Sequence, residues 1–81
     1  PERNVNRAEF LALLSRSLKI LPNQAGGTLY DDVNVGDWFG SYALISSQHN
    51  LFAGTKLHPD YFVTRREVAE VLYKLHQDGL L

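Results

Sequence analysis

Two segments, one near each end of the chain, repeat apolar residues at the spacing of an amphipathic helix. The apolar positions are Phe10, Leu13, Leu14 and Leu18 in the first segment, and Val68, Val71, Leu72 and Leu75 in the second. Each stripe would cover one face of a helix and bury it against the rest of the domain. The pattern predicts two amphipathic helices with a less regular region between them.

Each of these helices begins with the sequence signature of a capping box. Asn6 is followed three residues later by Glu9, and Thr64 is followed in the same way by Glu67. The cap side chain is expected to accept a hydrogen bond from the N–H of the glutamate, whose carboxylate turns back to the N–H of the cap. Both helices should therefore start within a residue or two of these caps.

A third helix is predicted in the middle of the chain, with Asp37 as its N-cap. Trp38, Tyr42 and Ile45 then form one row along it, and Asn50 tolerates the left-handed conformation that often ends a helix. The stretch "NQAGGTL" before it is a flexible loop rich in turn formers. The predicted fold class is all-α: a small helical repeat domain with three main helices and structured loops.

The two capped helices are also copies of one another at a constant offset of 58 residues, as from Val5 to Val63. The identical pairs are Pro1 with Pro59, Val5 with Val63, Arg7 with Arg65, Glu9 with Glu67, and Leu14 with Leu72. Similar pairs are Glu2 with Asp60, Asn6 with Thr64, Leu13 with Val71, and Arg16 with Lys74. Chance does not readily supply the proline, the acid and the cap at the same spacing, so the chain contains an internal repeat.

Composition narrows the function without naming it. The 81 residues allow one domain with a modest core, and no apolar run approaches the length of a membrane span. The net charge of −1 provides no broad basic field for a nucleic acid, and the absence of cysteine excludes disulfides and thiolate metal sites. Because the chain begins inside the first copy, we expect it to be part of a longer protein.

Residues 30–77 resemble one complete S-layer homology repeat, through "YDDV", "DWFGSYALISSQHNLFAG" and "VTRREVAEVLYKL". Residues 1–22 resemble the closing helix of a preceding repeat, so that residues 23–81 contain the one complete repeat. The chain departs from the family pattern in the short stretch "GTKLH" after Gly54, in Asn50 where glycine is usual, and in "TRRE" where "TRAE" is usual.

The resemblance implies a non-catalytic module that anchors a larger secreted protein to the bacterial cell surface. Such a module would bind a pyruvylated secondary cell-wall polysaccharide or a peptidoglycan-linked glycan. Arg65 and Arg7 match the family arginine just inside the helix cap, where a guanidinium and the helix N-terminus together favour an acidic sugar substituent. Trp38 would offer its indole face to a sugar ring, and Lys56 would add a second cation.

Each of these residues also has a purely structural interpretation. The arginines would be solvated charges or would pair with a nearby acid such as Asp32 or Asp60. Trp38 would pack in the core, and Lys56 would be a solvated loop lysine.

No pattern in the sequence predicts an enzyme, a metal site or a cofactor. The three histidines, His49, His58 and His76, lie too far apart in sequence for a metal-binding pair on one helix. A calcium loop starting at Asp32 fails, because Gly36, Asp37 and Ala43 stand at positions five, six and twelve, where a ligand, a glycine and a glutamate belong. We therefore expect a binding module.

Assembly follows from the repeat count. In the family, successive repeats surround a pseudo-threefold axis with binding grooves between neighbours, and this chain holds too few repeats to close that ring. We expect packing against neighbouring S-layer homology repeats or self-association through an open apolar stripe of Phe10, Leu14 and Leu18. The alternative function is a protein–protein docking or self-assembly module with a degraded glycan site, which the short loop after Gly54 supports.

Overall fold

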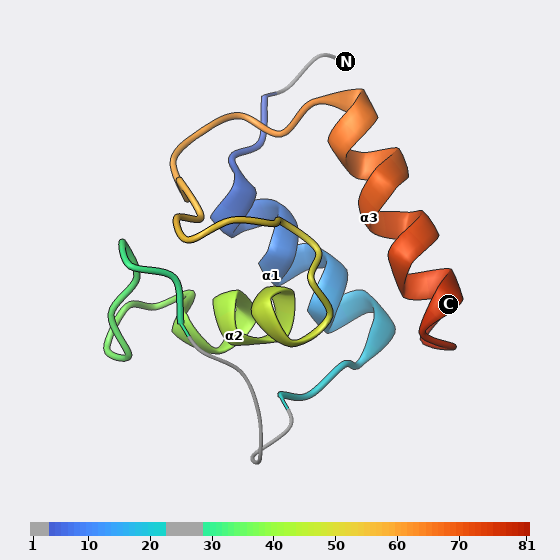
Figure 1. Ribbon diagram of the computed structural model, residues 1–81, viewed down its shortest axis with the longest axis horizontal. Coiled ribbons are helices and arrows are strands. Elements are labelled where there is room, and N and C mark those ends of the chain that lie inside the picture. Colours follow the sequence, from blue (N-terminus) through green and yellow to red (C-terminus); the bar gives the residue numbers. More distant parts are fainter. Residues whose placement is uncertain (1–3, 23–28) are drawn as a thin grey trace.

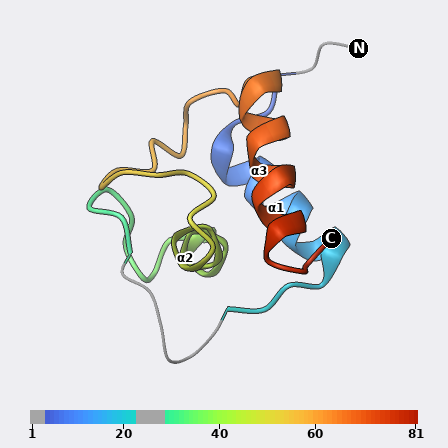
Figure 2. The same cartoon turned by 45° about the vertical axis from the view of Figure 1, so that its right-hand side comes forward.

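The computed structural model describes residues 4–22 and 29–81, and its regular structure there consists of three helices (Figure 1). They are α1 (Arg7–Leu18), α2 (Gly40–Gln48) and α3 (Arg65–Gln77). Helix α1 is central: α2 packs against it, and α3 contributes Val71 and Leu75 to the same buried cluster as Leu11 of α1 (Figure 2). The predicted all-α class is confirmed. Most of the predicted "NQAGGTL" loop, residues 23–28, lies outside the described residues.

Both predicted capping boxes are present. Asn6 accepts a hydrogen bond from the N–H of Glu9 at 2.8 Å, and the Glu9 carboxylate accepts one from the N–H of Asn6 at 3.1 Å. Thr64 and Glu67 repeat this exchange at 3.1 and 3.0 Å. The two helices therefore start in the same way, because each pair of side chains satisfies N–H groups that have no partner within the helix.

The middle helix begins later than predicted. Its first residue is Gly40, and Phe39 occupies the N-cap position without a side-chain hydrogen bond. Asp37 instead accepts a hydrogen bond from the N–H of Asn34 at 2.9 Å, so its carboxylate closes the preceding turn. Trp38 consequently lies in this turn and not on the helix. The left-handed conformation predicted for Asn50 is confirmed by its φ of 55°.

The core confirms the predicted stripe of α3 but corrects that of α1. Val71 and Leu75 are fully buried, as their spacing predicts. In α1 the buried residues are Ala8, Leu11, Ala12 and Ser15, whereas Leu13 is 58% exposed. The predicted open stripe of Phe10, Leu14 and Leu18 is partly buried against the core and does not form an open patch. The exposed apolar residue of this helix is Leu13, on a different face.

No helix within residues 4–22 and 29–81 is both long enough and apolar enough to cross a membrane.

Candidate functional site

The segments that lead into α1 and α3 lie side by side and hydrogen-bond to each other. The N–H of Val63 donates to the carbonyl of Val5 at 2.9 Å, and the N–H of Arg7 donates to the carbonyl of Tyr61 at 2.9 Å. The two segments meet in the upper part of both ribbon views, before their helices diverge (Figures 1 and 2). The repeat in the sequence is therefore also a contact in space.

Arg7 joins the two copies through its side chain. Its guanidinium donates to the carbonyl of Leu57 at 2.7 Å and forms an ion pair with the carboxylate of Glu67. The guanidinium carbon lies 4.7 Å from the ring centre of Phe52 and 5.6 Å from that of Tyr61. The side chain is only 17% exposed, and its buried Nε has no acceptor among the described residues. Arg7 is therefore part of the packed interior, and its acid partner is Glu67 instead of Asp32 or Asp60.

The Glu67 carboxylate divides its two oxygens between two tasks. One oxygen accepts the capping hydrogen bond from the N–H of Thr64, and the other binds Arg7. Burial raises the pKa of Glu67, but the hydrogen bonds from Thr64 and Arg7 and the charge of Arg7 outweigh it and lower the pKa below its ordinary value of 4.5. Glu67 is thus held ionised as both a helix cap and an ion-pair partner.

Asp32 holds the loop that supplies the other partner of Arg7. Its two carboxylate oxygens accept hydrogen bonds from the N–H groups of Leu57 and His58 at 2.9 and 2.8 Å. Burial raises the pKa of Asp32, but these two hydrogen bonds prevail and lower it below its ordinary value of 3.8. Asp32 therefore acts on Arg7 through the position of Leu57, without touching it.

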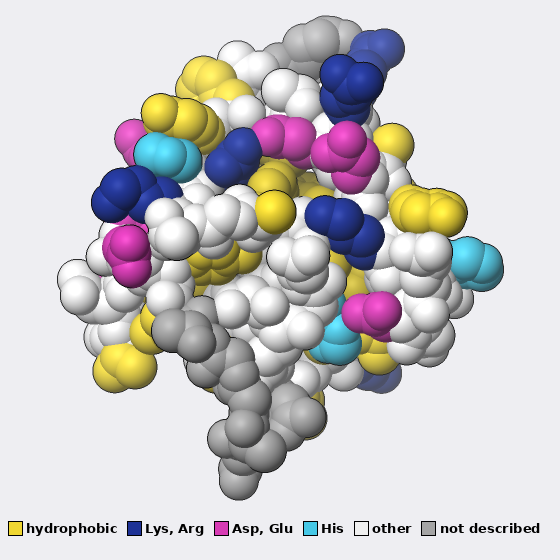
Figure 3. Space-filling model, in the orientation of Figure 1, with side chains coloured by type: hydrophobic (Ala, Val, Ile, Leu, Met, Phe, Trp, Pro, Cys, Tyr) yellow, Lys and Arg dark blue, Asp and Glu magenta, His cyan; other side chains and the backbone are white. Residues whose placement is uncertain are grey.

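A small groove opens where the two copies meet, between α3 and the loop at residues 51–53 (Figure 3). Its volume is about 170 Å³, and it is lined by Arg7, Leu51, Phe52, Ala53, Glu67, Glu70 and Lys74. Lys74 donates one hydrogen bond to the carbonyl of Asn50 at 2.9 Å and keeps its other N–H groups available. An apolar wall flanked by two cations and two carboxylates can bind a ligand that carries hydroxyl groups and one acidic group.

Two of the four predicted site residues, Arg65 and Lys56, are exposed and lie outside this groove. Arg65 is the first residue of α3, and Lys56 lies in the loop after Gly54. Neither side chain forms a hydrogen bond or an ion pair with another described residue, and neither lines the groove. Both are solvated charges in this structure.

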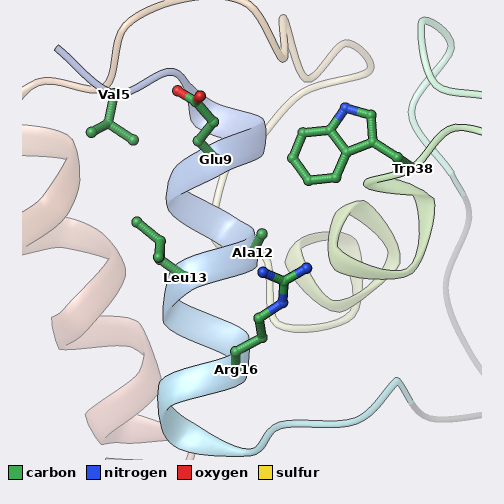
Figure 4. Close-up of a pocket in the computed structure, with 6 residues that line it drawn as sticks. All are labelled: Val5, Glu9, Ala12, Leu13, Arg16 and Trp38. Carbon is green, nitrogen blue, oxygen red and sulfur yellow. The ribbon is translucent and has the colours of Figure 1, made fainter.

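Trp38 lies beside a second, larger hollow along α1 (Figure 4). This α1 hollow has a volume of about 320 Å³ and is lined by Val5, Glu9, Ala12, Leu13, Arg16 and Trp38. Trp38 is 61% exposed, so it is not a core residue. Arg16 is held in place by a hydrogen bond of 2.9 Å from its Nε to the hydroxyl of Tyr42. The structure therefore separates Trp38 from the groove that contains Arg7.

Sequence reasoning missed Lys74 and Arg16 as site residues. The signal that could have revealed them is their alignment with each other in the repeat, because each follows its cap by the same ten residues. Within the described part of the chain, no group of three His, Cys, Asp or Glu side chains is placed to hold a metal ion.

Comparison with known proteins finds one informative similarity. The chain is 32% identical over 72 residues to endo-1,4-beta-xylanase A of Thermoanaerobacterium saccharolyticum. The match covers 86% of this chain but only 6% of the xylanase, so the chain spans a small part of that relative's length. No family model matches the chain, and no solved structure matches it.

Proposed function

We propose that this chain is a non-catalytic module of the S-layer homology type, which holds a larger protein at the bacterial cell surface. The sequence resemblance of residues 1–22 and 30–77 to such repeats supports this function. So does the similarity to only 6% of a xylanase, since a segment of that size fits an accessory part of an enzyme. The observation that carries the proposal is the packing of two repeat copies through Arg7 and Glu67.

The proposed ligand is an acidic, pyruvylated cell-wall polysaccharide, and the proposed site is the groove between the two copies. Arg7 already uses both terminal nitrogens, so its role is to shape the floor of the groove. Lys74 has N–H groups left for the ketal carboxylate, and Glu70 can accept from sugar hydroxyls. Arg65 would line a corresponding groove wherever a further copy packs against the start of α3.

Calorimetric titration with purified pyruvylated polysaccharide tests this assignment. Lys74→Ala is expected to weaken binding about tenfold or more, because it removes a charge-assisted hydrogen bond. Arg66→Ala is the matched control, since it removes one positive charge from an exposed position of the same helix. Equal losses in the two variants at moderate salt would show a diffuse charge effect and would refute the site.

The second candidate function is a docking or self-assembly module without a glycan ligand. It is favoured by the observation that Arg7, the family arginine in the first copy, joins two helices and is mostly buried. The same titration distinguishes the two functions. If no cell-wall polymer binds the intact chain, the docking function is the one that remains.

A further inference from the structure

The internal repeat gives each partner of the ion pair between Arg7 and Glu67 an equivalent residue in the same chain. The offset of 58 residues relates Arg7 to Arg65 and Glu67 to Glu9. Arg65 is exposed and forms no hydrogen bond or ion pair with another described residue. One copy thus donates its arginine to the other, while the second arginine and the first glutamate are left over.

Glu9, which pairs with no arginine among the described residues, is arranged in the same way as Glu67. Glu67 gives Oε1 to the N–H of Thr64 at 3.0 Å and Oε2 to Arg7. Glu9 gives Oε1 to the N–H of Asn6 at 3.1 Å, and its Oε2 has no partner among the described residues. The oxygen that receives an arginine in the second copy of the repeat therefore belongs to an exposed side chain in the first copy, where no described residue binds it.

The apolar residues one helical turn after the two glutamates also differ in how far they are exposed. Val71, one helical turn after Glu67, is fully buried. Leu13, one turn after Glu9 and equivalent to Val71 in the repeat, is 58% exposed. Glu9 and Leu13 both line the α1 hollow, and Figure 4 shows Trp38 across it from them. The face of the helix that is covered in the second copy is thus open in the first.

We propose that the α1 hollow is the docking site for the N-terminus of α3 from a second copy of this chain. In this contact Arg65 of one chain pairs with Oε2 of Glu9 in the other chain. The indole of Trp38 would offer its face to the incoming guanidinium, as the rings of Phe52 and Tyr61 do for Arg7. The opposite charges of Arg65 and Glu9, a repeated acceptor geometry and an uncovered apolar residue favour this occupant. The cation that also lines the hollow, Arg16, lies two helical turns from Glu9 and is bound to the hydroxyl of Tyr42.

The contact would join unlike surfaces, so a pair of chains would keep Glu9 available on the chain that uses its Arg65, and Arg65 available on the chain that uses its Glu9. Such heterologous contacts continue from copy to copy until a ring closes. This inference goes beyond the proposed function and does not depend on it, because the interface involves neither Lys74 nor a glycan. Its test therefore uses the protein alone.

Sedimentation velocity measures the association, and Trp38, the single tryptophan, reports on the hollow by its fluorescence. The intact chain is expected to gain mass with concentration up to about 1 mM, the range of weak contacts, with a concurrent change in emission. Arg65→Glu should abolish both effects. Arg66→Glu makes the same charge change one residue later on the same helix and should leave association intact.

A second experiment reverses the charge at each of the two positions in separate variants and then mixes the variants. Glu9→Arg alone should be monomeric, but an equimolar mixture of Glu9→Arg and Arg65→Glu should associate, because Arg65 of the first variant pairs with the unchanged Glu9 of the second and the two exchanged residues pair with each other. Because Glu9→Arg also loses a cap, Glu9→Gln provides a second variant that keeps the capping hydrogen bond and should still weaken association. A monomer at every concentration, or equal effects of Arg65→Glu and Arg66→Glu, would overturn the proposal.

Discussion

The guanidinium of Arg7, at the first position of one helix, pairs with the carboxylate of Glu67, which caps the other copy of that helix. This ion pair connects the two copies of the sequence repeat in the folded structure. The two capping boxes are alike, but only one of their glutamates is also bound to an arginine. The difference allows each role of the glutamate to be measured separately in one molecule.

Removing the two capping glutamates should therefore have unequal effects on stability. Glu9→Ala loses only a cap and is expected to lower the free energy of unfolding by about 1 kcal/mol or less. Glu67→Ala also leaves the mostly buried Arg7 without its acid and should cost about 2 to 3 kcal/mol. Urea unfolding of both variants measures this difference, and equal losses would mean that the ion pair adds nothing.

Removing the two equivalent arginines of the repeat should also have unequal effects on stability. Arg7→Ala removes an ion pair, a hydrogen bond to Leu57 and contacts with two rings, and should destabilise the fold by about 2 kcal/mol. Arg65→Ala removes a solvated side chain and should change stability by less than about 0.5 kcal/mol. Arg7→Lys should recover only part of the loss, because lysine lacks the planar fork. Thermal melts at one protein concentration provide the comparison.

Stability should fall in acid because of two carboxylates. The pKa values of Glu67 and Asp32 are lowered in the folded state from ordinary values of 4.5 and 3.8. Their contribution is therefore fully present above the unfolded values and is lost as the pH falls through the folded ones. Urea unfolding between pH 7 and about pH 3 should show this loss. Glu67→Gln and Asp32→Asn should each flatten the acid limb, and unchanged slopes would contradict the assignment.

Gly40 should not tolerate a side chain. A Cβ at this position would lie 3.0 Å from the carbonyl oxygen of Val35 and 3.2 Å from that of Asn34, and both are backbone atoms that cannot simply turn aside. Gly40→Ala is expected to cost about 1 to 3 kcal/mol through this overpacking. Gly36→Ala is the control, since nothing lies within 4 Å of its Cβ. Similar melting temperatures for the two variants would show that α2 shifts without strain.

The sequence was most informative about features that are local. A capping box involves residues three apart, so Asn6 with Glu9 and Thr64 with Glu67 were predictable without knowledge of the fold. The start of α2 was predicted wrongly because the Asp37 carboxylate can serve either a helix or the preceding turn, and it serves the turn.

The remaining features depend on tertiary contacts that periodicity does not specify. The apolar stripe of α1 was shifted because Leu11, and not Leu13, faces the core. The partner of Arg7 was missed because nothing in the sequence indicates which of several acids lies opposite it. Lys74 lines the groove because the loop at residues 51–53 lies beside α3, and the sequence does not specify that contact. The separation of Trp38 from Arg7 likewise follows from packing alone.

The most direct test of the proposed function is a calorimetric titration of the intact chain with cell-wall polysaccharide before and after chemical removal of its pyruvate. Binding to the native polymer and a loss of at least about tenfold after removal are expected, since the ketal carboxylate is the proposed partner of Lys74. Equal binding to both polymers would contradict recognition of an acidic substituent. Absence of binding to either would contradict the anchoring function of this chain.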